Sequence, residues 1–222
     1  MTDNIQSYIL AIDSATSILR VGLSLEDGKL VSLENNDRFR HAEFIFGLID
    51  GVLSRSGVDK SKLKGIVLCT GPGSFTGLRV GMASAKGLAS SLGIPLAGVS
   101  IYSAIAARLY RRIGRAAVLV PSRRNEYYYG LVDSRDFDND RIRVITAGEL
   151  AEHSTDIPLL FIDGEPDGIN PQDFKLLDPA EFRVQLEDLI VCGAKKLLTA
   201  GGDDISDLEP LYIQTFRAKT KK

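Results

Sequence analysis

The sequence predicts an α/β protein built from two related lobes, each formed around a mixed β-sheet. The first half of the chain contains three strand-like segments, followed by helical and strand-like segments that alternate. This order is typical of helices that cover a sheet with parallel strands. The second half repeats the order more loosely. We therefore expect one lobe over residues 1–112 and a second over residues 113–222.

The first lobe is expected to begin with three adjacent antiparallel strands, over residues 8–13, 19–26 and 30–34. The dipeptide at 27–28, Asp-Gly, separates the last two and is typical of a hairpin turn. Over residues 40–55, apolar side chains recur three and four positions apart, which indicates an amphipathic helix that ends at Gly57. The other expected elements are strands over 65–69 and 94–99, a helix from the glycine-rich turn at 70–77 to about 93, and a helix over 101–110.

The second lobe is predicted from the same patterns. Its expected elements are strands over residues 116–120, 126–132, 141–145 and 159–163, a short helix over 147–153, a long helix over 180–198 and a closing strand over 211–216. A basic tail then carries Arg217, Lys219, Lys221 and Lys222. No short-period repeat is present, which excludes a solenoid.

Composition narrows the functional classes. The chain has 222 residues, 44% of them apolar, and 27 basic against 29 acidic residues give a net charge of −2. Such a chain folds, but its overall charge does not favour binding to a polyanion. Its two cysteines, Cys69 and Cys192, lack metal-ligand spacing. We expect a cytoplasmic protein without a membrane partner, because neither an apolar span nor a signal sequence is present.

The strongest local motif is the glycine-rich segment at residues 71–81, between a buried strand and a helix. Gly71, Gly73 and Ser74 could hold a phosphate or carboxylate with the amides of the helix start. The alternative is a tight turn whose small residues let the helix pack closely on a neighbour. The segment lacks the Lys-Ser/Thr pair of a P-loop and the glycine spacing of a dinucleotide fold.

A second candidate lies at the end of the first strand, where Asp13, Ser14 and Thr16 place a carboxylate and two hydroxyls. ATP-handling α/β folds keep phosphate or metal contacts at such a strand end. The alternative is an Asx turn with hydroxyl caps, which needs no ligand.

Two helices offer a candidate docking surface for another chain. The small residues of the second helix would allow close helix packing, so these faces could form either a partner interface or plain core. The candidate interface residues are His41, Phe44, Ile45, Leu48, Ile49 and Val52 from the first helix and Met82, Ala85, Leu88 and Ala89 from the second.

The remaining polar residues give no catalytic or metal site. His41 and His153 each lack a second ligand at a suitable spacing. His41, beside Arg40 and Glu43, is expected to be exposed as a cap or interface residue. The basic turn at 121–125 and the tyrosines at 127–129 could form an RNA-facing patch, but strand alternation explains the tyrosines equally well.

Several of these segments closely resemble the bacterial TsaB family, also called YeaZ. The resemblance lies in residues 9–16, Arg-His-Ala-Glu at 40–43, Ala-Lys-Gly-Leu-Ala at 85–89, and most specifically residues 71–81. It covers nearly the whole chain. The resemblance implies the actin/Hsp70-like ATPase fold, which is ribonuclease H-like and has two related lobes.

The resemblance also implies a function. Members of this family assist TsaD, their catalytic paralogue, in attaching threonylcarbamoyl to the adenosine beside the anticodon of certain tRNAs, together with TsaE. It follows that this chain would bind TsaD through its helical face, contact tRNA indirectly and form a homodimer when alone. No tightly bound cofactor is expected, with ATP or ADP only in the complex.

One departure from the catalytic paralogue implies a pseudoenzyme. TsaD-like sequences carry Asn-His-Leu-Glu-Gly-His, whose two histidines bind a metal, whereas residues 100–105 here read Ser-Ile-Tyr-Ser-Ala-Ile. Ile101 and Ile105 cannot donate a lone pair. One alternative is a small-molecule kinase of the same fold, for which residues 13–16 are a candidate phosphate turn. A second is a glycoprotease-like peptidase, although the sequence shows no nucleophile–base pair for it. The third is an autonomous RNA-binding module.

Overall fold

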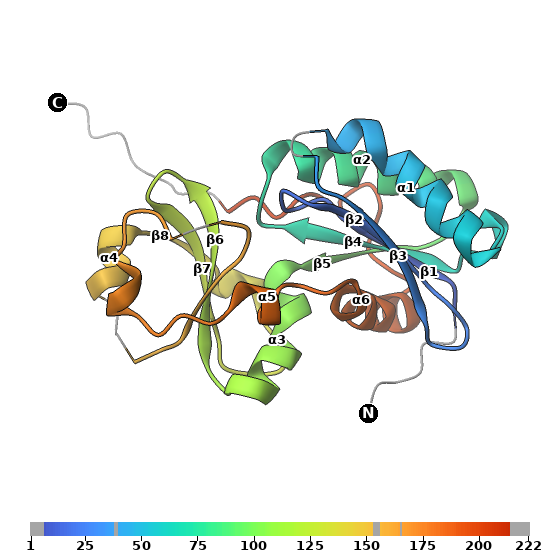
Figure 1. The fold of residues 1–222 in the computed structure, drawn as a ribbon. Coiled ribbons are helices and arrows are strands. Elements are labelled where there is room, and N and C mark those ends of the chain that lie inside the picture. Colours follow the sequence, from blue (N-terminus) through green and yellow to red (C-terminus); the bar gives the residue numbers. More distant parts are fainter. Residues whose placement is uncertain (1–6, 38–39, 153–155, 165, 214–222) are drawn as a thin grey trace.

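Two β-sheets, joined by a shared layer of helices, form the protein (Figure 1). The structure is a computed structural model that describes residues 7–37, 40–152, 156–164 and 166–213. His153 and the basic tail lie outside the described residues.

The first sheet has the strand order β3-β2-β1-β4-β5. Its strands are β1 (Ile9–Asp13), β2 (Leu19–Ser24), β3 (Leu30–Asn35), β4 (Gly65–Gly71) and β5 (Leu96–Ser100). The first three are antiparallel neighbours, as predicted, with Ile12 opposite Val21. Strands β4 and β5 run parallel to β1. All residues of β1, β2, β4 and β5 are buried, because helices cover both faces of the sheet.

The second sheet repeats this topology without the fifth strand, in the order β8-β7-β6-β9. Its strands are β6 (Ala116–Arg123), β7 (Glu126–Val132), β8 (Arg143–Thr146) and β9 (Leu159–Phe161). Strands β6, β7 and β8 are antiparallel neighbours, and β9 runs parallel to β6. The repeated order confirms the predicted α/β architecture with two related mixed sheets.

Helices α1 (His41–Ser56) and α2 (Phe75–Leu92) lie side by side on one face of the first sheet (Figure 1). Helix α1 packs on β2 and β3, and α2 packs on β4. Each ends at a glycine with positive φ, Gly57 and Gly93. Across the described residues, no helix is both long and apolar enough to cross a bilayer.

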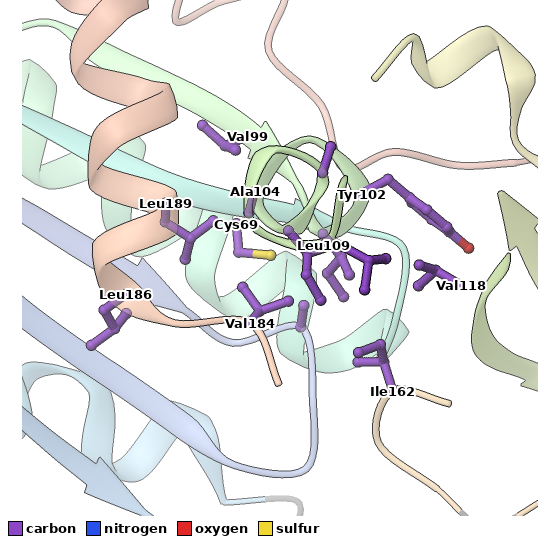
Figure 2. Close-up of a cluster of buried hydrophobic side chains, with 14 of the residues drawn as sticks. Cys69, Val99, Tyr102, Ala104, Leu109, Val118, Ile162, Val184, Leu186 and Leu189 are labelled. Atoms are coloured by element: carbon purple, nitrogen blue, oxygen red, sulfur yellow. The ribbon is translucent and has the colours of Figure 1, made fainter. Parts of the chain in front are cut away.

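The opposite face of this sheet is covered by α6 (Leu186–Ala200), which comes from the second half of the chain. Gly193 permits this contact, because a Cβ there would lie 2.4 Å from a methyl group of Val67. Helix α3 (Ile101–Ile113) lies between the two sheets. Figure 2 shows the resulting core, to which β4, α3, β6 and α6 all contribute.

The predicted long helix over 180–198 is wrong, because the chain forms two helices there. These are α5 (Pro179–Phe182) and α6, and Arg183 between them is extended at φ −57° and ψ 148°. Arg20 donates to the Val184 carbonyl at 2.5 Å, and Arg108 donates to the Arg183 carbonyl at 2.5 Å. Two arginines of the first lobe therefore take up carbonyls that a continuous helix would use internally.

The predicted closing strand over 211–216 is absent from its described part, residues 211–213. The Leu211 amide instead donates to the Thr70 carbonyl on β4 at 2.9 Å. Residues 214–216 lie outside the described residues. The other described elements are helix α4 (Ala147–Glu152) and short 3-10 helices at 60–62, 139–141 and 171–173.

We predict that Gly193→Ala lowers the free energy of unfolding by about 1–3 kcal/mol, because the added methyl group collides with Val67 on β4. Gly47→Ala is the matched control: this α1 position has no atom within 4 Å of an added Cβ, so the change should stabilise by about 0.5–1 kcal/mol. Urea unfolding measures both. Equal stabilisation by the two variants would contradict the contact between α6 and the first sheet.

Candidate functional site

The glycine-rich segment packs directly on the loop that follows β1. The Ser74 amide donates to the Ala15 carbonyl at 2.7 Å. A Cβ on Gly73 would lie 2.1 Å from the Ala15 carbonyl oxygen, and one on Gly77 would lie 2.2 Å from the Ser14 carbonyl oxygen. Only glycine fits at these two positions, so the segment serves the close packing that was the second of the two sequence-based interpretations.

This packing bears on whether the segment fits a nucleotide phosphate. The Ser74 amide already has a carbonyl acceptor, and the Ser74 side chain accepts from the Gly77 amide at 3.2 Å. Asp13 and Ser14 are fully buried. The predicted phosphate residues Asp13, Ser14, Thr16, Gly71, Gly73 and Ser74 are thus brought together. Of these six residues, Thr16 and Ser74 line a cleft of about 360 Å³, whereas Asp13, Ser14, Gly71 and Gly73 do not.

The Asp13 carboxylate instead forms a buried ion pair with Arg20 on the neighbouring strand. Its other oxygen accepts from the Ala15 amide at 3.1 Å. Burial alone would lower the pKa of Arg20, but the Asp13 carboxylate outweighs it and raises that pKa above its ordinary value. A carboxylate neutralised in this way is a poor ligand for a metal ion.

His41 is buried at 6% exposure, which corrects the expectation that it is exposed. Its Nε2 donates to the Thr16 carbonyl at 2.9 Å, and His41 is the first residue of α1. Helices α1 and α2 therefore both start against the loop at residues 13–16. This hydrogen bond could not be predicted from the sequence, because 25 positions separate His41 from Thr16.

Most of the predicted interface residues belong to the protein's own core. Besides His41, six are buried between the helices and the first sheet at 6% exposure or less: Ile45, Ile49, Val52, Met82, Ala85 and Ala89. Phe44, Leu48 and Leu88 are partly buried. The side chain that the sequence-based prediction missed is Phe46, which is 56% exposed. Phe46 is an apolar residue that does not follow the spacing of the buried positions of this amphipathic helix, and that departure is the sequence signal that identifies it.

Helical spacing places Phe46 on the same side of α1 as Ala42, one turn earlier. This side faces α2, because Ala42 and Val80 of α2 line one cleft. The cleft has a volume of about 360 Å³, and its other lining residues are Thr16, Ser17, His41, Ser74, Thr76, Gly77, Asp163 and Gly164. Ala42 and Val80 line the cleft, and helical spacing places Phe46 one turn beyond Ala42 and Gly87 and Leu88 about two turns beyond Val80. We call the surface over these five residues the α1/α2 groove.

At the two positions that the resemblance aligns with the histidines of TsaD-like sequences, this chain carries apolar isoleucines. Ile101 and Ile105 open α3 and are 1% and 0% exposed in the core between the lobes. Within the described part of the chain, no group of three or more His, Cys, Asp or Glu residues could hold a metal ion.

The cysteines are poor nucleophiles. Burial raises the pKa of Cys69 well above its ordinary value and that of Cys192 to about 11, so both thiols are protonated near neutral pH. Cys192 lines a second cleft, of about 420 Å³, between the two lobes.

The tyrosines at 127–129 do not form a shared surface patch. Tyr127 is 2% exposed, and its hydroxyl donates to the Asp167 carbonyl at 2.5 Å. The Tyr128 and Tyr129 side chains are only partly exposed. Strand alternation therefore accounts for these residues, as the alternative interpretation stated.

Comparisons of the sequence with known proteins identify a family model and relatives that this chain resembles. A family model described as TsaD, tRNA N6-adenosine threonylcarbamoyltransferase, matches residues 37–152, more than half of the chain. An uncharacterized protein of Mycobacterium tuberculosis is 33% identical over 166 residues, which cover 72% of this chain and 74% of that protein. The Escherichia coli tRNA threonylcarbamoyladenosine biosynthesis protein TsaB is 33% identical over 123 residues, or 54% of this chain and 53% of that protein.

Solved structures show the same fold. YeaZ from Pseudomonas aeruginosa superposes with a TM-score of 0.69 at 23% identity, covering 93% of this chain and all of that chain. The ethanolamine utilization protein EutJ from Carboxydothermus hydrogenoformans superposes with a TM-score of 0.52 at 9% identity, covering 84% of this chain and 90% of that one.

We predict that Asp13→Asn lowers the free energy of unfolding by about 3 kcal/mol at neutral pH, because it leaves the Arg20 guanidinium buried without a counter-charge. Adding Arg20→Met should restore part of this loss, since the buried charge is then removed as well. Urea unfolding of the two variants and the wild type measures the coupling. An Asp13→Asn variant within about 1 kcal/mol of the wild type would refute the role assigned to this pair.

Proposed function

The chain belongs to the TsaB/YeaZ family, and from this premise we propose that it takes part in tRNA threonylcarbamoyladenosine biosynthesis as a non-catalytic subunit that binds a TsaD-type transferase. The observation that carries the proposal is the α1/α2 groove, with Phe46 exposed on it. Large apolar side chains on such a surface are typical of protein interfaces.

The family model supports a paired arrangement of helices. Its match over residues 37–152 includes all of α1 and α2. A partner from the same family would carry an equivalent helix pair, and two equivalent pairs can pack around a pseudo-two-fold axis. The same self-complementarity supports a homodimer of this chain when the partner is absent.

In this proposal the TsaD-type partner, and not this chain, catalyses the transfer. Isoleucines replace the metal-binding histidines at 101 and 105, and the two thiols are protonated. The chain would act by binding the transfer-competent state of the transferase more tightly than its other states. TsaE would join the assembly, tRNA would be contacted mainly through the transferase, and ATP or ADP would bind only in the complex.

Two enzymatic alternatives have less support. A small-molecule kinase needs a free carboxylate at the phosphate turn, and Asp13 is paired with Arg20. A peptidase needs an activated nucleophile, and burial raises the pKa of both cysteines. ATP turnover by the purified chain alone would favour the kinase, and cleavage of casein would favour the peptidase.

The direct test of function is a reconstituted tRNA modification assay with the transferase, TsaE and activated threonylcarbamoyl, run with and without this chain. The proposal predicts that modification requires this chain. Equal modification in its absence would contradict the proposal.

We predict that Phe46→Glu weakens binding to the TsaD-type partner about 30-fold or more, because a charge replaces an exposed apolar side chain on the proposed interface. The fold should be retained, since Phe46 is 56% exposed. Leu198→Glu is the matched control, because Leu198 is 78% exposed on α6, away from the groove. Titration calorimetry measures both. A folded Phe46→Glu variant that binds like the wild type would disprove this interface.

A further inference from the structure

We propose that the second cleft, between the two lobes, binds a small zwitterion, an α-amino acid with an apolar side chain. The cleft has a volume of about 420 Å³, which lies within the usual range for small-molecule pockets. None of its lining residues lines the cleft beside the α1/α2 groove. The second cleft is therefore a separate site, and the assignment does not rest on the proposed function.

Both lobes contribute residues to this cleft. Val99 and Ser100, near the end of β5, come from the first lobe and are buried at 4% and 2% exposure. Phe137 and Asn139 come from the second lobe. The Ser100 hydroxyl donates to the Asn139 side-chain oxygen at 2.6 Å. A hydrogen bond between the lobes therefore holds the cleft together.

The apolar side chains of the cleft determine which ligand body fits. Those that line it are Val99, Ala107, Phe137, Val191, Leu208 and Leu211. Val191 is 51% exposed, although valine side chains are more often buried. A hydrocarbon group that covers these side chains removes apolar surface from water, which favours binding. The lining therefore fits a ligand with an apolar side chain.

The charged side chains of the cleft determine the polar end of the ligand. Lys196 already pairs with Asp203 at 3.1 Å and donates to the Gly98 carbonyl at 2.9 Å. Four others form no ion pair among the described residues, namely Arg135, Asp136, Lys195 and Glu209. These two cations and two anions balance, whereas an excess of cations favours a phosphate-rich ligand. A zwitterion presents one group to each sign of charge.

Asp136 and Lys195 are the pair that we assign to the ammonium and the carboxylate of the ligand. Both lie near the Cys192 thiol, which also lines the cleft. The pKa of this thiol is raised to about 11, first by burial and then by Asp188 and Asp136, while Lys195 acts in the opposite direction. The two charges therefore act on one point of the cleft, yet they form no ion pair with each other.

The test uses the full chain alone, L-leucine as the probe, and alkylation of Cys192 by N-ethylmaleimide as the readout. Cys69, the other cysteine, is 1% exposed, so peptide mass spectrometry of the Cys192 adduct reports on the cleft. We expect saturating leucine to slow this alkylation about fivefold or more, because it covers the thiol. At equal concentration, 4-methylpentanoate, which lacks the ammonium, and 3-methylbutylamine, which lacks the carboxylate, should bind about tenfold more weakly.

Two variants place the ligand in the cleft. Asp136→Asn and Lys195→Gln should each raise the leucine concentration for half-maximal protection about tenfold, because each removes one charge that meets the zwitterion. Both side chains are exposed, so the fold should be retained. The matched controls are Asp140→Asn and Lys62→Gln, at exposed positions that do not line the cleft, and they should leave the protection unchanged.

Three results would overturn the proposal. They are absence of protection by leucine, protection that the Asp136→Asn and Lys195→Gln variants leave unchanged, and equal or stronger protection by 4-methylpentanoate or by ATP. No partner protein is present in these measurements. A failure here therefore leaves the proposed function untouched, and a failure of partner binding leaves the leucine result untouched.

Discussion

The contact between the glycine-rich segment and the loop after β1 is the constraint on which the rest of the first lobe depends. The backbone of residues 73–77 lies so close to residues 14–15 that a single added methyl group would overlap a carbonyl oxygen. The same loop receives the His41 side chain at the start of α1. Both helices of the α1/α2 groove are therefore positioned by one short loop.

Much of the fold could be predicted from the sequence because its causes are local. Apolar runs bounded by turn residues predicted the strands, three-and-four spacing predicted α1, and glycines marked the ends of α1 and α2. The break between α5 and α6 could not be predicted, because its causes are the side chains of Arg20 and Arg108, far away in the chain. The burial of His41 has the same explanation, since Thr16 accepts its hydrogen bond.

The candidate site was predictable in outline and not in detail. Periodicity identified α1 and α2 as faces that are either core or interface, and the structure shows that their buried stripes are core. The exposed Phe46 follows the buried Ile45, and periodicity alone favours the buried positions over it. Asp136 and Lys195 lie far apart in the sequence, so only the folded chain brings them to one cleft.

We propose that the α1/α2 groove is the surface that meets a TsaD-type partner. Replacing Phe46 with the photoreactive p-benzoylphenylalanine, irradiating the assembled complex and mapping the cross-links by mass spectrometry tests it most directly. The account predicts cross-links to the partner's equivalent helix pair. Cross-links confined to other regions of the partner, or none in a complex that still forms, would contradict it.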